Sequence, residues 1–261
     1  MSGPIFIGGV PRSGTTLFRA MIHAHPRLHC GPERKLIAPI VRTQREWWTT
    51  FGSMLPAAGI RRATLDAAAG AYIRTLLAHS TPPGLRPAEK TPNVMLCVAD
   101  LGRMLPEARF IHVIRDGRAV AASLVRQHWV DPKSGQPVPY TRSVNNAATY
   151  WTQYLLKVSK DAPQVKGRYM EVRYEQLVAM PRAVMQQVLG FLGEPWDEAV
   201  LHHEQSDAAL PSTEASSEAV REAIHSRAVD GWRTHLSTDD IATIERIAGP
   251  VLQALGYSTT A

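Results

Sequence analysis

The residues best suited to chemistry follow a short apolar run near the start of the chain: Arg12, Ser13, Gly14, Thr15 and Thr16. A strand that passes through a glycine-containing turn into a helix presents free backbone N–H groups to an anion. Gly14 allows close approach of the backbone, and the threonine hydroxyls add donors. Arg12 adds a permanent charge whose planar fork fits an oxyanion. We therefore predict an anion-binding loop.

This loop differs from the one that holds the phosphates of ATP or GTP. That loop reads G-x-x-x-x-G-K-[ST], and its lysine reaches the phosphates. Here the lysine is missing and an arginine comes early in the motif. A later apolar strand also lacks the expected aspartate, because Ile114 is followed by Arg115. A nucleotide kinase is therefore disfavoured, although it stays as an alternative.

The surrounding pattern alternates strands and helices, which is typical of a parallel sheet covered by helices. The predicted strands cover residues 5–7, 109–114 and 168–173. The predicted helices cover residues 15–24, 65–78, 93–105, 118–125, 144–158 and 182–192, with a last helix capped by Ser237 and ended by Gly256. A surface loop is expected over 126–141 and a flexible segment over 205–220. The length suits a single α/β domain over residues 1–261.

Composition and charge are those of an ordinary globular protein with an excess of basic residues. Of the 261 residues, 44% are hydrophobic and 20% are charged, and the formal net charge is +6. This balance suits an anionic cofactor or an acidic partner, although charge alone identifies neither. The sequence lacks a basic helix, interleaved aromatic and basic residues, and zinc-finger spacing, so nucleic acid is not an expected partner.

Cysteine, histidine and hydropathy patterns exclude further classes. Cys30 and Cys97 show no C-x-x-C spacing, so we expect reduced thiols in a cytosolic protein. The histidines within 23–29 and 202–203 lack helical spacing with a third ligand, so no metal is expected. No stretch approaches the roughly 20 apolar residues of a membrane helix, and no signal segment opens the chain. We therefore predict a soluble, cytoplasmic protein without a membrane span.

Three segments resemble the sulfotransferases that use 3′-phosphoadenosine 5′-phosphosulfate (PAPS). PRSGTTL, at residues 11–17, resembles their 5′-phosphosulfate loop, and IRDGRAVAAS, at 114–123, resembles their 3′-phosphate segment. YEQL, at 174–177, is similar to their YE-L element. The tyrosylprotein sulfotransferase branch is the most similar, through residues 6–31, LHHE at 201–204 and LGY at 255–257. The ordered matches imply a P-loop-containing fold with a central parallel sheet flanked by helices.

The resemblance also assigns residues to the sulfate donor PAPS and its product, 3′-phosphoadenosine 5′-phosphate (PAP). The loop at residues 12–16 would hold the 5′ end, and Arg115 and Ser123 would hold the 3′-phosphate. Arg115 suits this role because ligands of open α/β sheets bind at the carboxyl ends of strands. Tyr174 would lie near the adenine. Two later assignments, to which solvated surface charge is the alternative, are Ser216 near the transferred group and Arg227 over the 3′-phosphate.

The same resemblance implies a catalytic set. Sulfuryl transfer, like phosphoryl transfer, depends on positioning and on cations that stabilise the leaving oxygen. Arg12 is the first candidate for that oxygen, and Lys90, in AEKTPNV, matches a family lysine and is the second; with these cations no metal is required. Glu33, in CGPERK, matches the catalytic glutamate of the tyrosylprotein enzymes, which takes the proton of the acceptor. The alternatives are a surface Lys90 and an exposed Glu33 paired with Arg34 or Lys35.

Departures from the tyrosylprotein pattern bear on the acceptor. Pro32 stands where that branch has a glutamate, Lys35 replaces an arginine, and a further family arginine falls near Pro39. In the animal enzymes these basic residues help to grip acidic peptides. The expected acceptor is a hydroxyl, first of all that of a protein or peptide tyrosine, with a small-molecule, glycan or lipid-linked hydroxyl as the alternative. A binding module without activity and a homodimer are also left open.

Overall fold

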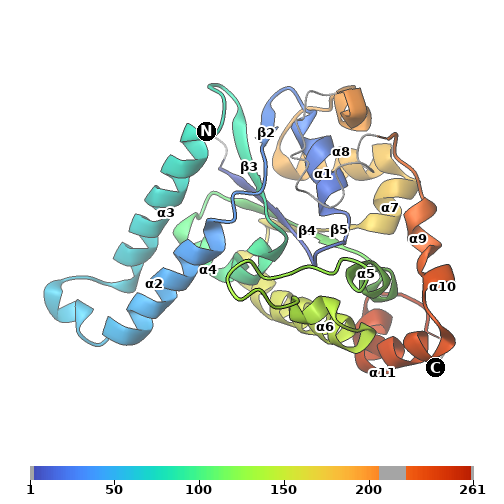
Figure 1. The fold of residues 1–261 in the computed structure, drawn as a ribbon. Helices are drawn as coiled ribbons and strands as arrows, with labels where there is room; N and C mark the ends of the chain where they lie inside the picture. Colours follow the sequence, from blue (N-terminus) through green and yellow to red (C-terminus); the bar gives the residue numbers. More distant parts are fainter. Residues whose placement is uncertain (1–2, 206–221, 260–261) are drawn as a thin grey trace.

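Five parallel strands form the central sheet, in the order β2-β3-β1-β4-β5 (Figure 1). The structure is a computed structural model, and it describes residues 3–205 and 222–259. Parallel strands end at one common edge, so the segments that follow β1, β3 and β4 lie next to one another. This arrangement confirms the predicted parallel α/β fold. The strands are β1 (Ile5–Gly8), β2 (Leu28–Cys30), β3 (Arg86–Lys90), β4 (Arg109–Ile114) and β5 (Tyr169–Arg173).

Helices cover both faces of this sheet, and alternate residues of β1 point to the two sides. Ile5 and Ile7 pack in one apolar cluster with α1 and α8, whereas Phe6 packs in the other with α3, α4, α5, α6 and α11. Each face of the sheet is therefore buried, as parallel sheets require. The helices are α1 (Thr15–His23), α2 (Ile37–Phe51), α3 (Arg62–His79), α4 (Val98–Met104), α5 (Gly117–Leu124), α6 (Val144–Asp161), α7 (Tyr174–Ala179), α8 (Pro181–Leu192), α9 (Arg227–Asp230), α10 (Trp232–His235) and α11 (Thr238–Ala254).

Most of the predicted helices occur within a few residues of their expected bounds. The last one begins with a capping box, in which Ser237 and Asp240 bond each other's backbone N–H groups, and Gly256 follows its end in the left-handed conformation. The helix predicted over 93–105 was partly wrong: a 3₁₀ segment (Pro92–Cys97) precedes the shorter α4. The loop predicted over 126–141 is confirmed as far as Val138, after which a 3₁₀ turn (Pro139–Thr141) follows, and a bridge joins Val130 to Pro137 within the loop.

Two strands, β2 and β3, were missed by the pattern analysis. β2 is only three residues long, and β3 reads RPAEK, which carries three charges and a proline. These charges are nevertheless buried because each has a partner of opposite sign: Arg86 pairs with Glu194, Glu89 with Arg34, and Lys90 with Glu33. Buried ion pairs are invisible to a search for apolar runs.

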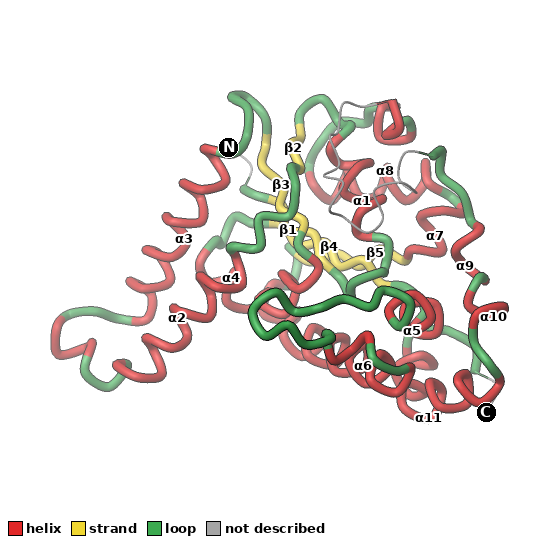
Figure 2. Tube along the Cα trace, in the orientation of Figure 1, coloured by secondary structure: helices red, strands yellow, loops and turns green. Residues whose placement is uncertain are grey.

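Helices α2 and α3 form an arm that projects from the side of the sheet (Figure 2). Neither α2 nor the short α7 was predicted. Within residues 3–205 and 222–259, no helix is long and apolar enough to cross a membrane. Except for Gln205, the segment predicted to be flexible over 205–220 lies outside the described residues, and so does Ser216.

Candidate functional site

The predicted anion loop connects the central strand β1 to helix α1. Gly14 is the N-cap of α1 and has a φ of 89°, which is the left-handed region that glycine adopts without strain. A Cβ at this position would lie 2.2 Å from the ring of Tyr174. Arg12 also has a positive φ, of 76°, which is costly for a residue with a Cβ. The loop therefore has two residues with positive φ, Arg12 and Gly14, and it places the first turn of α1 at the carboxyl edge of the sheet.

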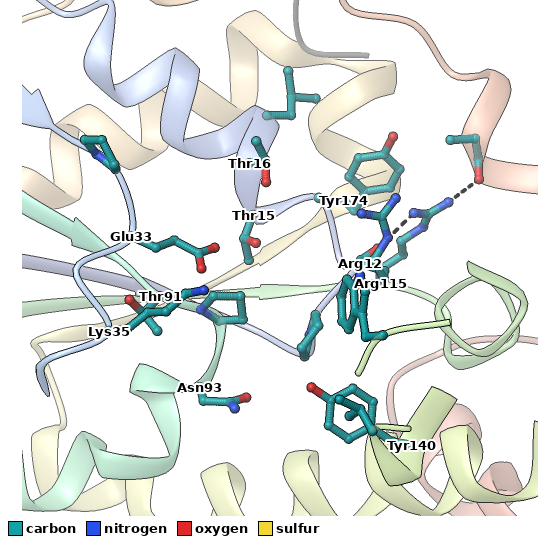
Figure 3. A pocket seen from close by; sticks show the side chains of 18 of the residues that line it. Arg12, Thr15, Thr16, Glu33, Lys35, Thr91, Asn93, Arg115, Tyr140 and Tyr174 are labelled. Atoms are coloured by element: carbon teal, nitrogen blue, oxygen red, sulfur yellow. Dashed lines mark hydrogen bonds between the residues drawn. The ribbon is translucent and has the colours of Figure 1, made fainter. Parts of the chain in front are cut away.

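Two arginines and a tyrosine form one side of the site (Figure 3). Arg115 donates from Nη1 to the Arg12 carbonyl at 3.0 Å, and its guanidinium carbon lies 4.5 Å from the centre of the Tyr174 ring. Arg12 donates from Nε to the hydroxyl of Ser123 at 3.0 Å. The predicted residues of the loop, of the segment after β4 and of the YE-L element are thus in contact.

The electrostatics of this side favour an anion. Burial lowers the pKa of the Arg12 guanidinium, and the nearby charge of Arg115 lowers it further. Burial likewise lowers the pKa of Arg115. The buried Oγ of Ser13 and Nε of Arg115 have no hydrogen-bond partner within the described part of the chain. A negatively charged ligand would stabilise the charges of Arg12 and Arg115 and could accept hydrogen bonds from Ser13 Oγ and Arg115 Nε.

A second charged group lies on the other side of the loop. Lys90, at the end of β3, donates from Nζ to Oε1 of Glu33 at 2.5 Å, and the lysine side chain is buried. Glu33 lies between β2 and α2, and its carboxylate points towards the loop threonines (Figure 3). Arg34 binds the buried carboxylate of Glu89 at 2.8 Å. These two charge pairs fasten the segment 31–35 to the end of β3. Lys90 is therefore a buried lysine and not a surface one, and Glu33 has it as an ion-pair partner.

One cavity of about 760 Å³ joins these groups. Arg12, Thr15, Thr16, Glu33, Arg115 and Tyr174 form its polar half. Pro92, Asn93, Trp129, Val130, Val138 and Tyr140 form a second, mainly apolar half. The ring of Tyr140 stacks on Tyr150 at 4.2 Å and meets Trp129 edge-on at 6.4 Å. The cavity can therefore take a charged group at one end and a flat apolar group at the other.

The apolar half was missed by the sequence analysis, which assigned residues 126–141 only to a surface loop. Val130 and Pro137 form a bridge, and Val138 donates from its N–H to the carbonyl of Trp129 at 2.7 Å. This short hairpin brings Trp129 close to Tyr140. The available signal was an aromatic residue at each end of a proline-containing loop that directly follows the Arg115 segment.

Several predicted site residues do not line the cavity. Lys90 and Ser123 are not in its lining and contact Glu33 and Arg12 from behind. Arg227 is 72% exposed and pairs with Glu222, so its side chain does not cover Arg115 in this structure. The backbone next to it does reach the site, because Arg115 donates from Nη2 to the carbonyl of Ala228.

No cluster of three potential metal-binding side chains occurs among residues 3–205 and 222–259. The cavity lining offers cations from Arg12 and Arg115, the carboxylate of Glu33 and the first turn of α1. Such a set can bind an anionic group, accept a proton from a hydroxyl and stabilise negative charge on a leaving oxygen.

Solved structures of sulfotransferases share this fold. The structure of the sulfotransferase domain from the curacin biosynthetic pathway matches with a TM-score of 0.70, at 23% identity and over 99% of both chains. The structure of mouse sulfotransferase SULT7A1 complexed with PAP matches with a TM-score of 0.57, at 12% identity, over 96% of this chain and 85% of that one. At these identities the likeness shows the fold alone.

The sequence comparisons go further. Protein-tyrosine sulfotransferase 2 of Gallus gallus is 34% identical over 97% of this chain and 69% of its own length. Protein-tyrosine sulfotransferase A of Caenorhabditis elegans is 32% identical over 98% of this chain and 68% of its own length. A sequence profile described as the sulfotransferase family matches residues 4–198. The chain therefore belongs to the sulfotransferase family.

Proposed function

We propose that this sulfotransferase moves a sulfuryl group from PAPS to a phenolic hydroxyl, in the first place that of a tyrosine side chain. The observation that carries the proposal is the position of Glu33, which lines the same cavity as the anion loop and an apolar, aromatic wall and is held by the buried Lys90. A base, a cation and an anion cradle then surround the point at which the acceptor would meet the donor. The names of the relatives, protein-tyrosine sulfotransferases, support the same acceptor class.

The polar half of the cavity fits the donor. The first turn of α1, with Thr15 and Thr16, would bind the 5′-phosphosulfate, because helix N-termini favour anions. Arg115 would bind the 3′-phosphate through its buried Nε, which has no hydrogen-bond partner in the described ranges. Tyr174, already stacked on Arg115, would pack against the adenine. Ser13, whose buried hydroxyl also lacks a partner among the described residues, would orient the loop around the ligand.

The residues between the two halves would carry the reaction. Glu33 accepts the proton of the acceptor hydroxyl as its oxygen attacks sulfur in line with the leaving group. A new S–O bond forms, the bond from sulfur to the bridging oxygen breaks, and PAP leaves with that electron pair. Lys90 and Arg12 stabilise the charge that develops on the bridging oxygen.

The apolar half favours an aromatic acceptor. Trp129 and Tyr140 offer ring faces and edges, and Pro92 and Val138 complete a slot in which a phenol would be desolvated. Lys35 is the basic side chain at the mouth on the Glu33 side, and it is exposed. An acidic residue next to the target tyrosine could pair with it, but a small phenol would need no such contact. The wall therefore supports a phenolic group more strongly than it supports a long peptide.

A transfer assay tests the proposal. The protein is incubated with sulfur-labelled PAPS, a chelator and separate acceptors: an acidic tyrosine peptide, the same peptide with phenylalanine, a simple phenol and a sugar. We expect label on the tyrosine peptide and none on the phenylalanine peptide. Label found only on the phenol or only on the sugar would contradict the proposed tyrosine acceptor but would still support PAPS as the donor. No transfer to any acceptor, together with no binding of PAP, would refute the function.

Replacing Gly14 with alanine should weaken PAP binding by at least about tenfold. The added methyl would overlap the Tyr174 ring, and the left-handed conformation costs a residue with a Cβ on the order of 1–2 kcal/mol, so the loop would have to shift. Titration calorimetry with PAP measures the loss. Gly59→Ala is the matched control, because Gly59 also has a positive φ but lies in the distant arm, where no atom of residues 3–205 or 222–259 is within 4 Å of its added Cβ. Equal PAP affinity in the Gly14 and Gly59 variants would contradict the proposed cradle.

A further inference from the structure

The backbone that carries Arg115 is held by side chains from two helices. The Arg115 carbonyl accepts a hydrogen bond from the indole of Trp151 on α6, at 3.1 Å. The next N–H, that of Asp116, donates to Oε1 of Glu175 on α7, at 2.9 Å. The position of the Arg115 side chain therefore depends on groups that lie outside the cavity lining.

Glu175 connects this backbone to the end of the chain. Its second oxygen, Oε2, accepts a hydrogen bond from the hydroxyl of Tyr257 at 3.0 Å. Tyr257 lies just after α11, and Arg173 holds this segment from below by bonding the Leu255 carbonyl at 2.8 Å and by lying 5.2 Å from the Tyr257 ring centre. Burial raises the pKa of the Tyr257 phenol, and the charge of Glu175 raises it further, so the hydroxyl stays protonated and donates.

A second contact ties the same segment to the other end of the Arg115 loop. Arg118 donates from Nη1 to the carbonyl of Ser258 and to Glu245 of α11, both at 2.8 Å. Arg118 is also held by the carboxylate of Asp116, which caps α5. Residues 255–258 therefore support the turn 115–118 at two points. Tyr257 acts on the Asp116 N–H through Glu175, and the Ser258 carbonyl accepts directly from Arg118.

We propose that Glu175 and Tyr257 are positioning residues that set the affinity for the 3′-phosphate of the donor by fixing the backbone of Arg115. The inference rests on the proposed function, in which Arg115 binds that phosphate. Neither side chain lines the cavity, so both act through the Asp116 N–H and not by touching the ligand. The end of the chain thereby becomes part of the donor site.

The test removes one oxygen atom. Tyr257→Phe keeps the ring on Arg173 and deletes the bond to Glu175, and we expect the dissociation constant for PAP to rise about 3- to 10-fold. Binding of adenosine 5′-phosphosulfate, which lacks the 3′-phosphate, should change less than twofold. Tyr72→Phe, on the exposed face of α3, is the control and should bind both nucleotides like the wild type.

Glu175 provides the conservative comparison. Glu175→Gln keeps an oxygen that can accept from Asp116, so its PAP affinity should fall less than that of Glu175→Ala, which loses both bonds. Unchanged PAP binding in Tyr257→Phe, or an equal loss for both nucleotides, would overturn the positioning role. A wild-type protein that does not bind PAP would instead refute the proposed donor, so the two failures are distinguishable.

Discussion

Replacing Glu33 with glutamine is expected to lower the rate of sulfuryl transfer by about 10²- to 10⁴-fold, which is the usual contribution of a general base. The amide has nearly the same shape and can still accept a hydrogen bond from Lys90, but it cannot take a proton from the acceptor. Because the donor cradle does not include this carboxylate, PAP affinity should stay within about twofold. Single-turnover transfer from labelled PAPS measures the first quantity, and calorimetry measures the second.

The control for this variant is Glu46→Gln, which removes an exposed carboxylate from α2 and should retain full activity. Both variants should unfold at the same temperature as the wild type within a few degrees. Transfer at the wild-type rate by Glu33→Gln would exclude Glu33 as the base and leave it only as the partner of Lys90. Loss of PAP binding together with activity would show that the Glu33–Lys90 pair maintains the donor site.

The sequence was sufficient to predict the parts of the site that are local. Residues 12–16 are one continuous segment at the start of α1, and a strand rich in β-branched residues ends directly before Arg115, so short-range patterns predicted both. The parallel topology then brought them together, because β1 and β4 are neighbours. The predicted α/β fold followed from the same alternation of strands and helices.

Other parts depend on pairings that no local pattern contains. Lys90 and Glu33 are 57 positions apart, and their contact exists because β2 and β3 pair at the edge of the sheet. β3 itself was missed because its charges are buried in ion pairs and not replaced by apolar residues. Tyr257 is 82 positions from Glu175, and only the packing of α11 against α5 and α6 brings it near the site. The sequence was sufficient to identify Lys90 and Glu33 as candidates, but it could not predict which of these residues are in contact.

Two substitutions of Arg12 can separate the effect of its side chain on catalysis from the effect of its backbone conformation on stability. Its positive φ is unfavourable for any residue with a Cβ, and such strain is retained where the side chain has a function. Arg12→Ala loses the guanidinium and keeps the strain, whereas Arg12→Gly loses both. We therefore expect Arg12→Gly to be more stable than Arg12→Ala by about 1 kcal/mol in the free energy of unfolding, as measured by denaturant titration.

Both variants should nevertheless lose about 10²- to 10³-fold in kcat/KM for PAPS, because neither can stabilise the leaving oxygen. Ser123→Ala, which removes only the hydroxyl that orients Arg12 at 3.0 Å, should lose less than either. A glycine variant that is both more stable and nearly inactive would mean that the left-handed arginine is kept for catalysis at the expense of stability. If Arg12→Gly instead transferred sulfate at more than a tenth of the wild-type rate, Lys90 would be the principal cation at the leaving oxygen.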